Sequence, residues 1–136
     1  MKQIFVLLAS VYFFSLFYFE ISNADKLKYK PQSIDQNGVK VTITPLNISN
    51  DVKIWEFDVA LETHTQDLSE DLIKAAFLIA DEIQYKPLSW KGSPPVGHHR
   101  KGILILKAIE PPPKSIEFQL RLKVDPAPRS FRWELW

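Results

Sequence analysis

The chain has 136 residues, of which 46% are hydrophobic and 24% charged, and its formal net charge is +1. These values predict one globular domain and exclude both a disordered chain and one drawn to nucleic acid by a strong positive field. The chain has no cysteine, which excludes disulfides, thiolate catalysis and zinc ribbons.

The N-terminus has the layout of a signal peptide. Lys2 precedes an apolar run over residues 4–19, and Ser22-Asn23-Ala24 supplies small residues for cleavage before Asp25. We therefore predict a signal peptide over residues 1–24 and a periplasmic or secreted protein. An N-terminally membrane-anchored protein is the alternative, because more lysines follow the apolar run than precede it.

Strand patterns begin after a short polar segment. Residues 25–37 lack periodicity and are predicted to form a leader ahead of a β-sandwich domain over residues 38–136. Residues 39–44 alternate apolar and polar side chains, as a half-buried strand does. The next strand has a predicted inward face of Trp55, Phe57, Val59, Leu61 and Thr63. Its more polar face carries Glu62 and ends at His64.

Residues 68–83 fit two structures. Apolar side chains recur there at helical spacing, which would give one amphipathic helix. The stretch also fits a short helical turn over residues 68–73 and then a hairpin around Asp81-Glu82, with strands over 74–80 and 83–87. The β-rich surroundings favour the turn and hairpin.

The C-terminal part is predicted to contain one loop and three strands. Pro, Gly and His residues indicate a loop over residues 90–101, and the apolar run over 103–109 indicates a strand buried on both faces. Pro111-Pro112-Pro113 ends that strand, and alternating patterns predict further strands over 116–124 and 131–135. About seven strands separated by turns predict an all-β fold, an immunoglobulin-like antiparallel β-sandwich.

All three histidines lie where strands give way to loops, which suggests a ligand site. Imidazole and carboxylate groups suit Zn²⁺ or Cu²⁺, and an arginine beside them suits a small anionic ligand. The predicted metal ligands are His64, His98, His99 and Asp67. The neighbours predicted to assist a ligand or to brace the loop are Arg100, Asp71, Glu62 and Trp90.

The same residues also have a structural interpretation. Loop histidines commonly bond to main-chain carbonyls, and Arg100 would clamp the loop by an ion pair with Asp67 or Asp71. Trp90 would then either contact a partner or cover one end of the sandwich. Two functions stay open: a protein that binds a divalent metal or small anion, and a structural or interaction module whose partner is an envelope protein.

No catalytic signature is present in the sequence. The chain has no G-x-S-x-G nucleophile turn, no H-E-x-x-H zinc motif and no glycine loop for phosphate. Adjacent carboxylates such as Glu70-Asp71 are expected to be solvated turn residues. We predict that the protein is not an enzyme.

The elements Thr63-His64 and Gly97-His98-His99-Arg100, with Phe131-Arg132-Trp133 near the end, resemble a group of uncharacterised exported bacterial proteins. The resemblance covers nearly the whole chain after the signal segment. It implies a small immunoglobulin-like sandwich in the cell envelope and implies no activity. It also implies that the Thr-His and Gly-His-His-Arg elements meet at one end of the sandwich. The chain has Val96-Gly97 where the group has Gly-Gly, and Asp81-Glu82 where the group has a longer Asp/Gly-rich turn.

Overall fold

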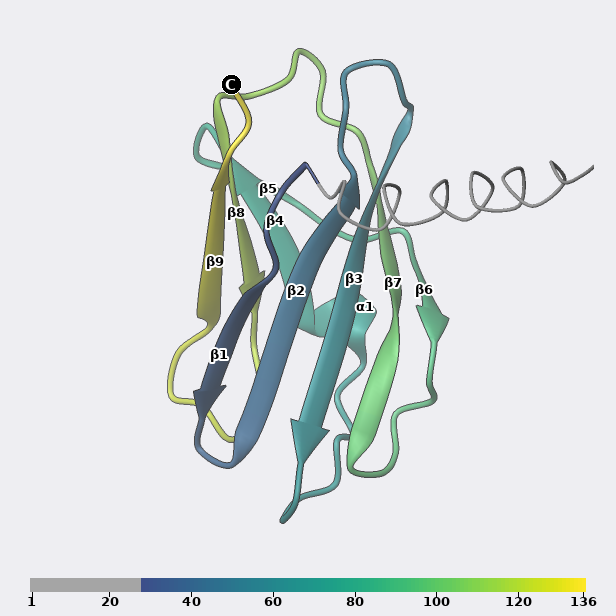
Figure 1. Ribbon diagram of the computed structural model, residues 1–136, viewed down its shortest axis with the longest axis vertical. Helices are drawn as coiled ribbons and strands as arrows, with labels where there is room; N and C mark the ends of the chain where they lie inside the picture. The colour runs from purple at the N-terminus through teal and green to yellow at the C-terminus, as the bar shows by residue number, and fades with distance from the viewer. Residues whose placement is uncertain (1–27) are drawn as a thin grey trace, which may run out of the picture.

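Two antiparallel β-sheets pack face to face in the computed structural model, which describes residues 28–136 (Figure 1). The five-stranded sheet has the order β1-β2-β3-β7-β6, and the four-stranded sheet has the order β5-β4-β8-β9. The strands are β1 (Gln32–Gln36), β2 (Val39–Asn47), β3 (Ile54–Thr63), β4 (Ala76–Ala80), β5 (Ile83–Tyr85), β6 (Ser89–Gly92), β7 (His99–Lys107), β8 (Ser115–Leu120) and β9 (Arg129–Glu134). The predicted all-β antiparallel sandwich is confirmed, with more strands in the described residues than the sequence pattern indicates.

The chain enters the sandwich earlier than predicted. The signal peptide predicted over residues 1–24 lies outside the described residues. Strand β1 lies within residues 25–37, so the prediction that this whole segment is a leader was wrong. The strand is polar because it forms one edge of its sheet, where only Gln32 and Ile34 are half-buried. Within residues 28–136, no helix has the length and apolar character needed to cross a membrane.

The turn Asn37-Gly38 joins β1 to β2. Asn37 and Gly38 have φ values of 50° and 79°, which Asn and Gly tolerate and which a two-residue hairpin turn requires. The hairpin pairs Gln36 with Val39. An Asn-Gly dipeptide between extended segments is a strong hairpin signal. This signal would have predicted that residues 32–36 pair with the strand that follows the turn.

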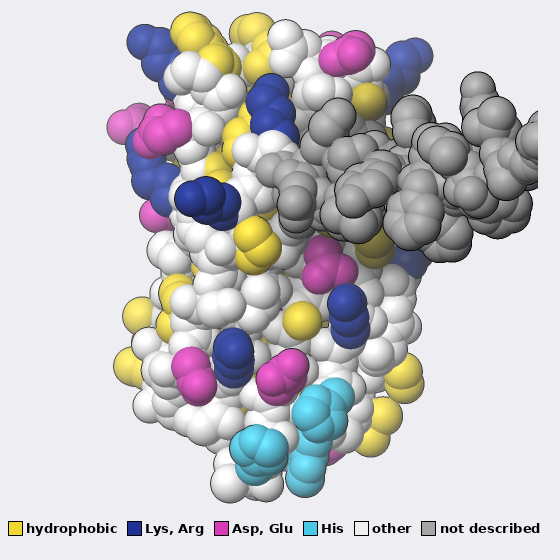
Figure 2. All heavy atoms as spheres, in the orientation of Figure 1, with side chains coloured by type: hydrophobic (Ala, Val, Ile, Leu, Met, Phe, Trp, Pro, Cys, Tyr) yellow, Lys and Arg dark blue, Asp and Glu magenta, His cyan; other side chains and the backbone are white. Residues whose placement is uncertain are grey.

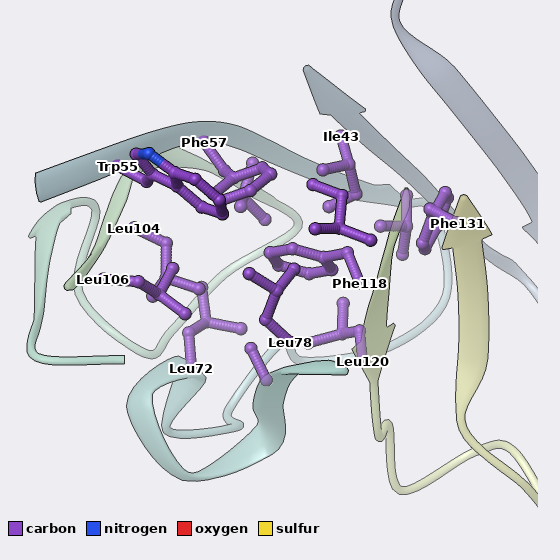
Figure 3. Close-up of a cluster of buried hydrophobic side chains, with 14 of the residues drawn as sticks. Ile43, Trp55, Phe57, Leu72, Leu78, Leu104, Leu106, Phe118, Leu120 and Phe131 are labelled. Atoms are coloured by element: carbon purple, nitrogen blue, oxygen red, sulfur yellow. The ribbon is translucent and has the colours of Figure 1, made fainter. Parts of the chain in front are cut away.

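The core follows the predicted alternation of side chains. The five predicted inward residues of β3, from Trp55 to Thr63, are each at most 3% exposed. Phe118 of the opposite sheet lies against Phe57, with ring centroids 5.2 Å apart, and Phe131 meets Phe118 edge-on (Figure 3). Each such buried side chain stabilises the fold by about 1.5–3 kcal/mol.

The stretch over residues 68–83 forms a helical turn and a hairpin, as the surroundings favour, but the turn lies over residues 72–75 and not over the predicted 68–73. Helix α1 (Leu72–Ala75) begins after Asp71, whose Oδ1 accepts a hydrogen bond from Ile73 N at 3.0 Å. Strands β4 and β5 then pair around Asp81-Glu82. Both turn residues have positive φ, 51° and 68°, as the favoured two-residue hairpin turn requires.

Strand boundaries in the C-terminal part differ from the predicted ones. The loop predicted over residues 90–101 is strand at both ends, because β6 ends at Gly92 and β7 begins at His99. Strand β7 is buried on both faces at Leu104, Ile105 and Leu106, whereas Ile103 is half-buried and Lys107 is exposed. The strand predicted over residues 116–124 ends at Leu120.

Side chains of β1 and β9 close one side of the sandwich. Gln32 Nε2 donates to Arg132 O, and Gln32 Oε1 accepts from Arg132 N, so this amide bonds to β9 as a neighbouring strand would. Arg129 is 2% exposed and holds both carboxylate oxygens of Asp125. The same guanidinium donates to the main-chain oxygens of Ile34, Gln36 and Val39. Arg129 thus fixes the β1–β2 hairpin to the opposite sheet.

Acid is expected to weaken this contact. Burial alone would raise the pKa of Asp125, but hydrogen bonds from Arg129 and Asn37 outweigh burial and hold that pKa below its ordinary value. Because the folded pKa is the lower one, Asp125 stabilises the fold above about pH 4, and this contribution is lost as the pH falls through the folded pKa. Urea unfolding should show that the free energy of unfolding of the unaltered protein falls more steeply below about pH 4 than that of an Asp125→Asn variant. Identical acid dependence of the two proteins would contradict the expectation.

Candidate functional site

Three segments that are far apart in the sequence meet at one end of the sandwich: the β1–β2 turn, residues 63–68 and residues 93–99. We call this the histidine end. The hydrogen bonds that join the segments are Thr63 N to His98 O (2.9 Å), Leu68 N to Gly97 O (2.9 Å), Thr63 Oγ1 to Gly38 O (2.7 Å) and Gln66 Nε2 to Asn37 O (2.8 Å). The Thr-His and Gly-His-His-Arg elements therefore do meet, as the resemblance implies.

Asp67 fixes the loop that carries the paired histidines. Its Oδ1 accepts a hydrogen bond from Gly97 N at 2.7 Å. Gly97 has a φ of +91°, a conformation that glycine adopts at little cost. One oxygen of this predicted metal ligand is thus bonded to the main chain of the loop.

Replacing Asp67 with alanine should loosen this loop without unfolding the sandwich. The Gly97 N–H loses its charged acceptor, and because both residues are near the surface we expect a cost of about 1–2 kcal/mol. Hydrogen exchange should quicken at the Gly97 and Leu68 amides before it quickens in β3. Unchanged exchange at these amides would show that Asp67 does not hold the loop.

The imidazoles of His64, His98 and His99 are exposed at this end. Figure 2 shows histidine side chains together at the lower end of the molecule, with acidic and basic side chains directly above them. His64, Lys40 and Glu62 line a hollow of 390 Å³. His99 lies opposite Glu62 in the β3–β7 register, and both line a second hollow of 260 Å³ together with Lys101. Glu62 therefore lies between the two hollows.

Arg100 is buried, with 2% of its surface exposed. Its Nη1 donates to the main-chain oxygens of Glu70 at 2.7 Å and of Leu68 at 3.5 Å. Burial lowers the pKa of Arg100, while the charges of Glu70 and Asp71 oppose that change. The predicted ion pair of Arg100 with Asp67 or Asp71 was wrong. The guanidinium instead donates to main-chain oxygens. Asp67 and Asp71 each accept a hydrogen bond from a main-chain N–H group.

Trp90 lies on β6, the edge strand of the five-stranded sheet. Its two predicted roles, a partner contact and a cover over one end of the sandwich, stay predictions. The side chain is half-buried and packs against the core. Its Nε1 donates to Ser93 O at 2.9 Å, and the Arg100 guanidinium lies over its ring, 5.8 Å from the centroid. The ring also covers Gly92 and Gly102, where side chains would collide with it.

The histidine end does not contain an assembled metal site. Among residues 28–136, no three His, Asp or Glu side chains are placed so that they could hold one metal ion together. Asp71 caps α1 and Asp67 bonds to Gly97. A metal bound by His64, His98, His99 and Asp67 stays a prediction.

Charged residues of the β1–β2 hairpin were missed by the sequence interpretation. Asp35 and Lys40 line the first hollow with His64, and they pair with each other across the hairpin. The Asn37-Gly38 turn between them was the available signal, since it fixes which residues of the two strands lie opposite each other.

The chain is similar in structure to a known protein, although its sequence matches none of the families compared. No known family matches the chain, and no curated protein sequence matches it. Among solved structures, the chain is similar to MPT63, a secreted protein from Mycobacterium tuberculosis. The two are 14% identical, the match covers 81% of this chain and 95% of MPT63, and the TM-score is 0.45.

Proposed function

We propose that the protein is an exported, non-catalytic binding module that contacts its partner through the histidine end. One observation carries this proposal: hydrogen bonds hold three distant segments in place at this end, while the histidine side chains of two of these segments stay exposed. Loops that are already ordered in the free protein lose less conformational entropy when a partner binds, which favours affinity. Export is supported by the signal-peptide layout over residues 1–24 and by the resemblance to exported envelope proteins.

Site-specific cross-linking tests which end binds a partner. Val96 at the histidine end and Ile83 in the β4–β5 hairpin have similar exposure, 57% and 53%. A photoreactive side chain at position 96 should give a defined adduct in the exported fraction of cells, and the same side chain at position 83 should not. Equal adducts at both positions, or none at position 96, would reject the proposal.

A divalent metal is the second candidate ligand, favoured by the gathering of histidines at one end (Figure 2). Zn²⁺ or Cu²⁺ at about a hundredfold excess over its dissociation constant should stabilise the protein by about 2.7 kcal/mol. His64→Ala should abolish this gain, and Lys123→Ala should leave it unchanged. If neither metal changes thermal unfolding at neutral pH, the histidine end does not bind these ions.

The alternative is a structural module in which the histidine loop only completes the fold. In that case thermal unfolding would not respond to metals, and position 96 would give no adduct.

A further inference from the structure

A separate hollow of 440 Å³ lies where helix α1 meets the residues that follow β8. We call it the basic hollow. Its charged lining residues are Lys74, Arg121, Lys123, Glu70, Asp71 and Asp125. Its size falls within the range of about 300–1,000 Å³ that is usual for sites of small ligands.

The carboxylates of the basic hollow are already bonded within the protein. Asp125 forms a buried ion pair with Arg129, so its charge is neutralised. Glu70 Oε2 accepts from Lys123 N at 3.0 Å, and Asp71 Oδ1 accepts from Ile73 N at 3.0 Å. Each of these carboxylates thus has at least one oxygen bonded within the protein, and Asp125 is the one of the three that is paired with a cation.

The cations are more available. Lys123 Nζ donates to Ser69 Oγ at 2.9 Å. Lys74 and Arg121 are exposed, and within the described part of the chain their side chains form no ion pair. The buried Arg100 lies beside this hollow, since its Nη1 donates to Glu70 O at 2.7 Å. Once Asp125 is paired with Arg129, positive groups therefore outnumber negative ones at this hollow.

The geometry of the hollow suits a small anion with an apolar part. Arg121 N donates to Ala75 O at 2.9 Å, which fixes the main chain of Arg121 beside α1. The half-buried Ala75 supplies apolar lining, whereas Leu122 is 2% exposed and offers a ligand almost no surface. A guanidinium offers parallel N–H donors that match carboxylate or phosphate oxygens, and a lysine adds a point charge.

We propose that the basic hollow binds a small organic anion, whose carboxylate or phosphate group is held by Arg121 and Lys74 and whose apolar part lies on Ala75. This site is independent of the histidine end. The protein would then carry two binding surfaces, and failure of one would leave the other untouched.

Calorimetric titration of the full chain, purified in the form that the cell releases, tests the site with three probes. Inorganic phosphate and succinate represent the two oxyanion groups, and succinamide is the uncharged control. We expect one or both anions to bind at millimolar concentration or below, and the affinity to fall as salt rises. Arg121→Gln should weaken binding about tenfold, while Arg132→Gln, an exposed arginine on β9, should not.

Each result decides the proposal. Binding of phosphate alone or of succinate alone supports the site and identifies its group. Absence of binding by both anions, equal binding of succinamide, or an affinity that Arg121→Gln leaves unchanged overturns it. If Arg121→Gln does not fold, Lys74→Gln replaces it, because Lys74 is exposed on α1. None of these results depends on the cross-linking at position 96.

Discussion

Arg129→Ala is expected to lower the free energy of unfolding by about 3–5 kcal/mol, because it leaves a buried charge without its partner. In the folded protein the side chains of Arg129 and Asp125 are fully buried, and Arg129 Nε lies 2.6 Å from Asp125 Oδ2. The guanidinium also satisfies three main-chain oxygens of the β1–β2 hairpin. Alanine leaves Asp125 and these oxygens in a site that water reaches poorly.

The control for this variant lies on the same strand. Arg132 pairs with Glu134, but the two side chains are 62% and 67% exposed, so Arg132→Ala should change stability by less than about 1 kcal/mol. Urea unfolding measures both variants. A loss below about 1 kcal/mol for Arg129→Ala would show that water enters the site and that the contact does not hold the hairpin to β9.

The fold could be predicted largely because its core strands follow a strict alternation. Trp55, Phe57 and Phe118 occupy positions that an amphipathic strand turns inward, and they meet between the sheets. Strand β1 could not be found in this way, since an edge strand needs little apolar surface. Its place depends on the Asn37-Gly38 turn and on bonds from Gln32 to β9.

The burial of two arginines was missed. Arg129 lies on the same face of β9 as Phe131, and Arg100 on the same face of β7 as Leu104, but charged residues normally face water. Both bond to main-chain oxygens of segments about 30 and 90 residues away, which only the folded chain brings near. The meeting of the histidine segments was predictable from the resemblance. The bonding of Asp67 to Gly97 was not, because it depends on a loop conformation that a single sequence does not specify.

Gly102→Ala is expected to cost about 3 kcal/mol by forcing β6 away from β7. A Cβ at this position would lie 2.5 Å from Gly92 Cα, 2.6 Å from Lys91 O and 2.8 Å from Cη2 of Trp90. Two of these atoms belong to the main chain of β6, so a change of side-chain rotamer cannot relieve the collision. Strand β6 is a four-residue edge strand, and its separation would also remove the ring that lies against Arg100.

Gly97→Ala is the matched control, because an added Cβ there meets nothing within 4 Å and the only cost is the φ of +91°. We expect that cost to be about 1–2 kcal/mol. Urea unfolding compares the two variants, and hydrogen exchange at Lys91 and Ser93 reports on β6, since Ser93 N bonds to Lys101 O in the intact hairpin. These amides should exchange faster in Gly102→Ala than in Gly97→Ala. If the two variants are equally stable and equally protected at β6, the close approach of Gly92 and Gly102 is not a constraint on the fold.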